Sequence, residues 1–200
     1  MSPVHIPVSS ERSLFRARRV VRESSLLFIS DLLRAIQASE RSVLFNRALL
    51  ENYITRNPLF MYSLGPVEVE ENAPIVVRRA RDAAAVAEVG PFAAIPGAIA
   101  DLALEEMLSS GASVCLVEDG GEIAANSRIP LNVGVYAGSS PISGRIGFHL
   151  GSGDFPIGIA TSSASVSHAL NFGEADAAVA VADTAALSDA SATAICNAVT

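Results

Sequence analysis

The strongest constraint on the fold is a change in the spacing of apolar residues near Gly111. Before this point, apolar residues recur at helical spacing in three segments, 42–57, 74–90 and 96–109. After it, short apolar runs alternate with turn pairs such as Asp119-Gly120. Helices followed by adjacent short strands predict an α+β fold with mostly antiparallel strands packed against helices, rather than a regular strand-helix repeat.

Further elements complete the predicted order. The short apolar runs predict strands over 113–118, 122–126, 131–138, 144–150 and 156–161. We also expect paired strands within 16–31, a short helix over 165–170, a buried strand over 177–182, and a final Ala-rich helix over 184–199 with Asp183 as its N-cap. Since no internal repeat or low-complexity linker divides the chain, we expect a single domain over 1–200, with 1–15 as a mobile N-terminal tail.

The charge is unevenly distributed along the chain. Residues 1–60 carry +4 and residues 61–200 carry −11, which gives the net charge of −7. The N-terminal arginines are not interleaved with stacking aromatic residues, and the acidic remainder would repel a phosphate backbone, so we expect no nucleic acid partner. The chain has no Lys, which excludes Schiff-base chemistry and a Walker-type phosphate lysine.

Several features predict a cytoplasmic protein without a membrane segment. Asp101 interrupts the best apolar run, 91–108, before it reaches the length of about 18 residues that a span needs. The N-terminus lacks the apolar core of a secretory signal. Cys115 and Cys196 are too few for a disulfide framework, and both lie in apolar stretches, so we expect them to be reduced core residues.

Asp189 and Thr193 are the first candidate ligands. They stand one turn apart in the predicted final helix, so their side chains project from one face. A carboxylate and a hydroxyl suit Mg²⁺, and an ion held by so few protein groups would keep positions for phosphate oxygens and water. The alternative is structural, because Thr often bonds the carbonyl four residues back and Asp is often solvated.

Two other segments offer places for an anionic ligand. Gly120 and Gly121 follow a predicted strand, where paired glycines let a ligand approach the backbone, although Asp-Gly-Gly also forms hairpin turns. Hydroxyl residues crowd 161–167, just before a predicted helix whose N-terminus would favour phosphate, but such residues also serve as caps and turns. The residues singled out there are Thr161, Ser162, Ser163, Ser165 and Ser167, with His168 among them.

We assign no catalytic residue from these patterns. A serine nucleophile at 162 or 163 with His168 as its base is disfavoured, because the glycine frame of a nucleophile elbow is absent. His149 lies in a strand pattern and is expected to be structural.

Six stretches, taken in order, resemble the ApbE-like superfamily: NPLFMYSLGPV, VGPFAAIPGAIAD, VEDGGEIAAN, YAGSSPISGRIG, GIATSSASVSHALNFGEADAAV and ALSDASATAICN. They cover nearly all of the chain from about Arg19 onward. The resemblance is to the short branch of that superfamily rather than to the longer, well-studied flavin transferases. It implies an ApbE-like α+β fold, FAD as ligand, Mg²⁺ at the pyrophosphate, and transfer of FMN to a threonine hydroxyl of a partner protein.

The resemblance also implies roles for individual residues. The family's Asp and Thr metal ligands look like Asp189 and Thr193, and its carbonyl ligand looks like Ala93. Its glycine-glycine-acid turn and its Thr-Ser segment imply a cofactor-binding set of Gly120, Gly121, Glu122, Thr161, Ser162 and Ser163, to which we add His168. Two positions depart from the family pattern, since Pro96 stands in place of a Lys and Glu122 in place of the usual Asp.

Two functions are therefore carried forward. The leading hypothesis is a protein that binds FAD or FMN, or a related diphosphate, with Mg²⁺ and transfers FMN to a hydroxyl of an acceptor protein. The alternative is a non-catalytic, homo-oligomeric binding or assembly module that retains the ApbE-like fold. The departures at Pro96 and Glu122 favour the module, whereas the retained Asp189 and Thr193 favour the enzyme.

Overall fold

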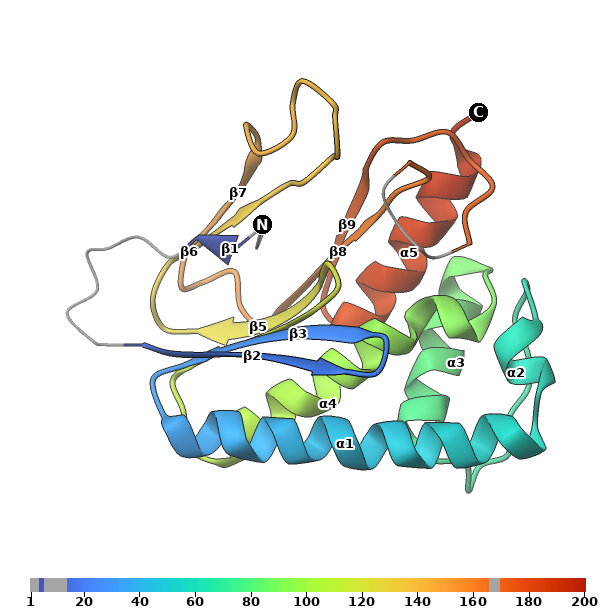
Figure 1. Ribbon diagram of the computed structural model, residues 1–200, viewed down its shortest axis with the longest axis horizontal. Coiled ribbons are helices and arrows are strands. Elements are labelled where there is room, and N and C mark those ends of the chain that lie inside the picture. Colours follow the sequence, from blue (N-terminus) through green and yellow to red (C-terminus); the bar gives the residue numbers. More distant parts are fainter. Residues whose placement is uncertain (1–3, 6–13, 166–169) are drawn as a thin grey trace.

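The computed structural model describes residues 4–5, 14–165 and 170–200 (Figure 1). Its helices are α1 (Leu33–Arg56), α2 (Leu59–Tyr62), α3 (Ile75–Ala87), the 3₁₀ helix η1 (Pro91–Ala94), α4 (Ile95–Ser109) and α5 (Ala185–Ala198). Its strands are β1 (Val4–His5), β2 (Phe15–Val21), β3 (Ser24–Ser30), β4 (Val114–Asp119), β5 (Glu122–Ser127), β6 (Leu131–Gly134), β7 (Gly147–Leu150), β8 (Ile157–Ser162) and β9 (Ala178–Ala182).

The strands form two antiparallel sheets. The larger has the order β2-β3-β4-β5-β8-β9, and the smaller has the order β1-β6-β7. Tight hairpins link β2 to β3 and β4 to β5, whereas β8 joins β5 only after the chain has built β6 and β7. The predicted α+β class, with antiparallel strands in a single domain, is confirmed.

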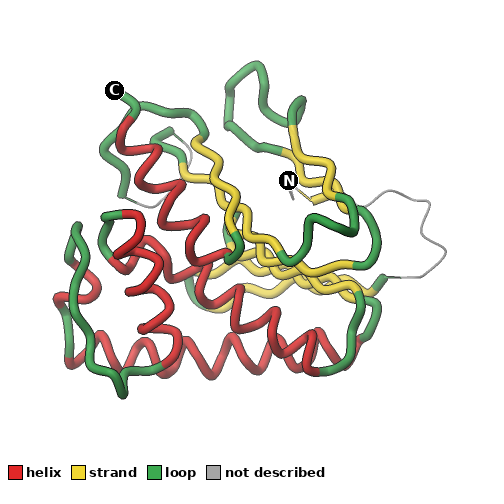
Figure 2. The backbone as a smooth tube through the Cα atoms, turned by 180° about the vertical axis from the view of Figure 1, so that it is seen from behind, coloured by secondary structure: helices red, strands yellow, loops and turns green. Residues whose placement is uncertain are grey.

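Helices cover one face of the large sheet, and the small sheet lies on its other side (Figures 1 and 2). α4 packs on β4 and β5, while α5 packs on β8 and β9. Because successive side chains of a strand face opposite sides, each central strand contributes to two cores. Val117 and Ala124 lie in the core under the helices, whereas Leu116 and Ile123 lie in the core shared with the small sheet.

The predicted helices are present, but one is much longer than expected. The segment 42–57 is only the C-terminal part of α1, which begins at Leu33. Ser39 and Asn46 are buried on its inner face and interrupt the apolar spacing that would have marked it. The helices predicted over 74–90 and 96–109 correspond to α3 and α4.

The C-terminal part of the chain corrects two expectations. Asp183 is not the N-cap of α5; Thr184 is, because its backbone is extended and its hydroxyl accepts a hydrogen bond from the N–H of Leu187 at 3.2 Å. β9 is an edge strand with Val181 exposed, so it is not fully buried as expected. The helix predicted over 165–170 includes 166–169, which lie outside the described residues.

The remaining expectations concern the cysteines, the chain start and membrane segments. Cys115 and Cys196 are buried and unpaired, as predicted. Of the expected tail over 1–15, residues 4–5 form β1 and Phe15 begins β2, while residues 1–3 and 6–13 lie outside the described part. Among the described residues, no single helix is long and apolar enough to cross a membrane. The successive helical segments 75–87 and 91–109 are long and apolar enough only when taken together, and the chain bends by 107° between them.

Candidate functional site

The β4–β5 hairpin turns on Gly120 and Gly121, which lie between the paired residues Asp119 and Glu122. Both glycines have positive φ, 71° and 133°, which residues with a Cβ rarely adopt. A Cβ on Gly121 would lie 3.8 Å from the carbonyl oxygen of Thr161 in β8. The glycines therefore form a hairpin turn and also border Thr161.

Asp189 of α5 reaches the first turn of α4. This residue is 7% exposed, and its Oδ2 accepts a hydrogen bond from the N–H of Gly97 at 3.0 Å. The unpaired N–H groups and the dipole of a helix N-terminus stabilise a carboxylate in this position. The solvated Asp189 of the structural alternative is wrong, because the carboxylate is buried between two helices.

Ala93 lies in η1, four residues before Gly97. In a helix continuing back from Gly97, the N–H of this glycine would donate to the carbonyl of Ala93, four residues earlier. Here that N–H donates to Asp189, and α4 begins at Ile95 after the 3₁₀ turn η1, on which α5 also packs. The Gly97 N–H thus bonds to a side chain of α5 close to the point where η1 passes into α4.

Thr193 lies one turn after Asp189 and is half-buried. Within the described part of the chain its hydroxyl makes no hydrogen bond, whereas the hydroxyl of Thr55 in α1 donates to the carbonyl of Glu51 at 2.8 Å. Back-bonding to the helix therefore does not explain Thr193. Ala93, Asp189 and Thr193 offer a carbonyl, a carboxylate and a hydroxyl at one helix junction, and all three are hard oxygen donors.

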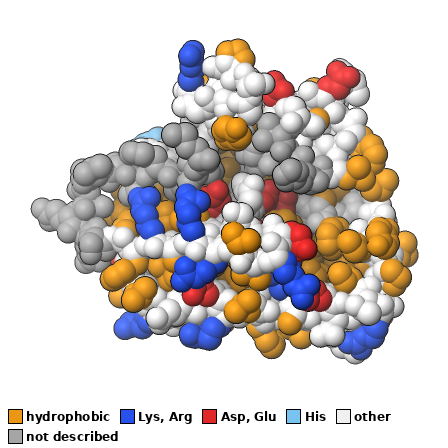
Figure 3. All heavy atoms as spheres, viewed as in Figure 1, with side chains coloured by type: hydrophobic (Ala, Val, Ile, Leu, Met, Phe, Trp, Pro, Cys, Tyr) orange, Lys and Arg blue, Asp and Glu red, His pale blue; other side chains and the backbone are white. Residues whose placement is uncertain are grey.

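Two more carboxylates approach this junction from the sheet. Strand alternation places Asp119 on the same face as Val117, and Glu122 on the same face as Ala124, both toward the helices. Acidic side chains are visible in a hollow near the middle of the face in Figure 3. No three His, Cys, Asp or Glu side chains of the described residues form a metal-binding group, so any cation would rely on the mixed donors above.

The pKa values reflect this crowding of acids. Burial, followed by the charges of Asp189 and Asp119, raises the pKa of Glu122 well above its usual range. Burial also raises the pKa of Asp189; the Gly97 N–H opposes this rise, and the charges of Asp119 and Asp101 add to it. The junction therefore gathers carboxyl groups whose charged form is disfavoured by their surroundings and would be stabilised by a cation.

Sequence reasoning did not single out Asp119. This residue is 3% exposed, and its Oδ2 accepts a hydrogen bond from the Ser24 hydroxyl at 2.8 Å. Arg47 of α1 donates to the same hydroxyl at 2.7 Å. Burial raises the pKa of Asp119, while Ser24 and the charge of Arg47 oppose the rise. The available signal was its position directly before the paired glycines, which sets it opposite Glu122 in the hairpin.

Ser162 and Ser163 are buried where β8 passes into its following loop. The Ser162 hydroxyl donates to Oδ1 of Asn171 at 3.1 Å, and the Ser163 hydroxyl accepts from the N–H of Ser165 at 3.2 Å. Both hydroxyls therefore have partners within the loop, whereas Thr161 lies beside the glycine turn. Their predicted role toward phosphate stays a prediction.

The end of this loop closes on the C-terminal end of α5. Phe172 N–H donates to Oδ1 of Asn197 at 2.9 Å, and Glu174 N–H donates to the Val199 carbonyl at 2.8 Å. His168, the remaining predicted cofactor-binding residue, lies outside the described residues. In the small sheet, Nδ1 of His149 lies 2.7 Å from Oδ1 of Asn132, which agrees with the structural role expected for it.

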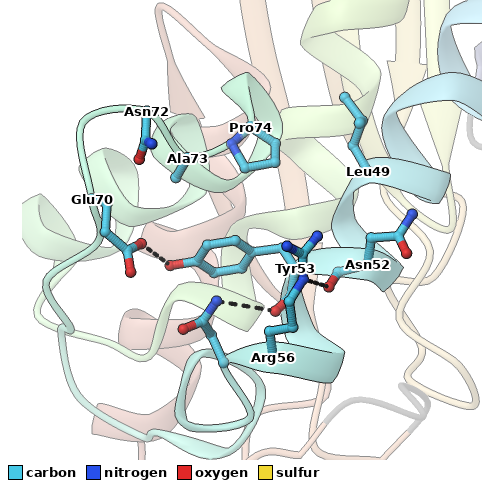
Figure 4. Close-up of a pocket in the computed structure, with 9 residues that line it drawn as sticks. Leu49, Asn52, Tyr53, Arg56, Glu70, Asn72, Ala73 and Pro74 are labelled. Carbon is cyan, nitrogen blue, oxygen red and sulfur yellow. Dashed lines mark hydrogen bonds between the residues drawn. The ribbon is translucent and has the colours of Figure 1, made fainter.

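A separate groove of about 480 Å³ lies at the C-terminal end of α1 (Figure 4). The Tyr53 hydroxyl donates to Glu70 at 3.0 Å, and burial together with this acceptor raises the pKa of Tyr53 to about 12. None of the predicted site residues lines it. Its walls are Leu49, Asn52, Tyr53, Arg56, Asn57, Glu70, Asn72, Ala73 and Pro74.

Relatives in sequence match nearly the whole chain. A family model described as AbpE bacteria matches residues 13–200. The UPF0280 protein MJ1526 of Methanocaldococcus jannaschii is 40% identical over 186 residues, which are 92% of this chain and 75% of the relative. A UPF0280 protein of Methanosarcina acetivorans is 38% identical over 195 residues, 98% of this chain and 74% of the relative.

Solved structures with a similar fold are flavin transferases. The apo form of the Pseudomonas stutzeri flavinyl transferase ApbE superposes with a TM-score of 0.54 at 12% identity, covering 92% of this chain and 84% of the other. The flavin transferase ApbE of Vibrio cholerae gives a TM-score of 0.51 at 12% identity, with coverage of 92% and 86%. The fold is thus the one seen in the ApbE flavin transferases. The family match over residues 13–200 establishes that this chain belongs to the AbpE bacteria family.

Proposed function

We propose that the junction of η1, α4, α5 and the β4–β5 turn binds a divalent cation together with the diphosphate of FAD or a related flavin nucleotide. The protein would then transfer FMN to a hydroxyl group of an acceptor protein. The observation that carries the proposal is the buried Asp189 carboxylate, which binds the first turn of α4 at Gly97 and lies near the carboxyl group of Glu122. The Ala93 carbonyl of η1, on which α5 packs, and the Thr193 hydroxyl, one turn further along α5, would add two oxygen donors. The fold shared with ApbE flavin transferases supports a flavin nucleotide as the ligand.

The donor set fits Mg²⁺, which prefers oxygen ligands and keeps several positions for water and phosphate. The Gly97 N–H donates a hydrogen bond to one carboxylate oxygen of Asp189, so the other oxygen can bind the ion. Within the described part of the chain, the Thr193 hydroxyl makes no hydrogen bond that would compete with the ion. The residues that would hold the ion are Ala93, Asp189 and Thr193. When bound, the ion would neutralise charge on the diphosphate and stabilise the leaving oxygen.

The remaining residues would place the nucleotide. The turn at Gly120 and Gly121 lets a ligand come close to the backbone, and Thr161 lies on its border. In the transfer, the acceptor hydroxyl oxygen would bond to the phosphorus of the FMN half. The bond from that phosphorus to the bridging oxygen would break, AMP would leave, and the hydroxyl proton would pass to water.

Thr193→Val is the sharpest test of this proposal. It removes a hydroxyl that has no hydrogen bond in the described structure, so stability should stay within about 0.5 kcal/mol of wild type. We expect Mg²⁺-dependent binding of FAD, measured by titration calorimetry, to weaken about tenfold, a loss of about 1.4 kcal/mol. Release of AMP from FAD should slow in parallel.

Thr55→Val is the matched control, because it removes a helical threonine hydroxyl on the exposed side of α1. This control should bind FAD and Mg²⁺ as wild type does. Equal binding by wild type and Thr193→Val would remove Thr193 from the site. A wild-type protein that shows neither Mg²⁺-dependent flavin binding nor AMP release would refute the function itself.

A non-catalytic assembly module is the second candidate. Large apolar side chains around α2 are exposed, with 67% of Leu59, 72% of Tyr62 and 63% of Leu64 accessible to solvent. Figure 3 shows hydrophobic side chains gathered on the same side of the molecule, at the right of the view. Such surface is typical of contacts between proteins. Self-association in sedimentation experiments, without AMP release from FAD, would favour this candidate.

A further inference from the structure

Asp101 binds the start of α5, although it belongs to no predicted ligand set. It lies in α4 and is 8% exposed. Its Oδ1 accepts a hydrogen bond from the N–H of Ala185 at 2.8 Å, and its Oδ2 accepts one from the N–H of Ala186 at 2.9 Å. Both carboxylate oxygens therefore satisfy N–H groups that the first turn of a helix leaves without an intrahelical partner.

The two helices exchange carboxylates. Asp101 of α4 binds the first turn of α5, and Asp189 of α5 binds the first turn of α4 through Gly97. The arrangement is the same in both helices. In α4, Asp101 follows by four residues Gly97, whose N–H bonds to α5; in α5, Asp189 follows by four residues Ala185, whose N–H bonds to α4. The position of Asp189 is therefore tied to the contact that Asp101 makes.

The backbones of the two helices also touch at this point. A Cβ on Gly97 would overlap the backbone carbonyl of Ala185. Such close contact leaves no room for one helix to move toward the other without displacing it. α5 also has a cap of its own, because Thr184 accepts from Leu187, so the bonds from Asp101 fix where the helix starts in addition to capping it.

We propose that Asp101 is a positioning residue of the candidate site. It holds the start of α5 against α4, so that Asp189 and Thr193 stay beside Ala93, and it does not touch the ligand itself. This inference rests on the cation site of the proposed function and assigns to that site a residue that acts through the helix junction.

The experiment measures Mn²⁺ binding to the full chain in the presence of FAD, by electron paramagnetic resonance. Asp101→Asn replaces one acceptor oxygen by an amide that would face an N–H donor, so one of the two bonds to α5 is lost. We expect this variant to bind Mn²⁺ at least tenfold more weakly than wild type, at temperatures where circular dichroism shows it folded. Glu105→Gln is the matched control, because Glu105 lies one turn further along α4, exposed and paired with Arg79 at the surface.

A double variant separates positioning from a general loss of stability. If Asp101 acts through α5, the hydroxyl of Thr193 is already displaced in Asp101→Asn, so adding Thr193→Val should weaken Mn²⁺ binding less than it does in wild type. A general loss of stability would leave the Thr193→Val effect unchanged in the folded protein. Should Asp101→Asn not fold, Asp101→Glu replaces it in both measurements, because it keeps two acceptor oxygens on a side chain longer by one methylene.

The outcomes are distinct. Weaker Mn²⁺ binding by the Asp101 variant, with a reduced effect of Thr193→Val, supports the positioning role. A folded Asp101 variant that binds Mn²⁺ as tightly as Glu105→Gln overturns it. The positioning role is also overturned if Thr193→Val weakens Mn²⁺ binding as much in the Asp101 variant as it does in wild type. If wild type itself binds no Mn²⁺ with FAD, the proposed function fails, and the inference that rests on it fails as well.

Discussion

The α4–α5 junction and the groove beside Tyr53 place their polar groups in opposite ways. At the junction, the carboxylates of Asp101 and Asp189 are buried and bind helix N-termini, and further acids crowd around them. In the groove, Glu70 is exposed, and the Tyr53 hydroxyl uses it as its acceptor. The groove is the more open of the two regions, whereas the junction buries carboxyl groups, which costs the folded state more free energy.

This difference shows that open volume alone is a weak guide to function. A hollow with exposed polar walls costs the folded state little, because water satisfies its groups. Buried acids that raise one another's pKa destabilise the folded state, and such arrangements are concentrated at functional sites. The comparison implies that substitutions at the junction destabilise the protein more than substitutions in the groove do. The following variants test this.

Gly97→Ala should have the largest effect. Its Cβ would overlap the Ala185 carbonyl, and backbone atoms cannot yield as a side chain can, so we expect a loss of about 3 kcal/mol in the free energy of unfolding. Gly65→Ala, in the loop before α3, is the control, because a Cβ there would meet nothing within 4 Å and should change stability by less than about 0.5 kcal/mol. Urea unfolding measures both. Equal effects would mean that the helices are not in tight contact.

Asp31→Asn tests a carboxylate that is well supplied with donors. Partial burial raises the pKa of Asp31, but bonds from the Ser113 hydroxyl and from the N–H groups of Val114 and Ser113 outweigh it, so the pKa lies below its ordinary value of 3.8. Asp31 therefore stabilises the fold above that value, and the stabilisation is lost as the pH falls through the lower pKa of the folded state.

We expect Asp31→Asn to destabilise the protein by about 1 kcal/mol at pH 7. The difference from wild type should begin to shrink as the pH falls below about 4, where the carboxylate of the unfolded chain is protonated, and should shrink further as the pH approaches the lower pKa of the folded state. Thermal unfolding followed from pH 7 to pH 3 checks this. A difference that stays constant over this range would show that the charge of Asp31 has no part in the effect.

Tyr53→Phe should have the smallest effect. It removes the hydrogen bond to Glu70 at an exposed acceptor, so we expect a loss of roughly 0.5–1 kcal/mol in stability. Binding of FAD with Mg²⁺ should equal that of wild type in the same calorimetric titration used for Thr193→Val. Weaker nucleotide binding by Tyr53→Phe would contradict the comparison, because it would give the groove a part in the site.

Local patterns predicted those parts of the fold that depend on neighbouring residues. The paired glycines of the β4–β5 hairpin and the apolar spacing of α4 are visible in the sequence because turn and helix preferences act over a few residues. The start of α1 was missed, since Ser39 and Asn46 put polar groups on its buried face. The cap of α5 was misplaced by one residue, because Asp183 and Thr184 are both good N-caps.

The candidate site was predicted in part for the same reason. The spacing of Asp189 and Thr193 gave their common helix face, but the partner of Asp189 is Gly97, 92 residues away. Asp101 lies 84 residues before Ala185, so no local pattern relates it to α5. Contacts of this range depend on how the helices pack, and a single sequence holds no direct record of them.

The fixing of α5 at both ends affects how a ligand can bind. Its first turn is held by Asp101 and Gly97, and the loop after β8 binds its last turn through Phe172 and Glu174. These contacts at both ends oppose sliding of the helix along its axis, so a ligand bound as proposed at Asp189 and Thr193 would find both side chains already in place. Little conformational entropy then remains to be lost on binding, and more of the contact energy becomes available as affinity.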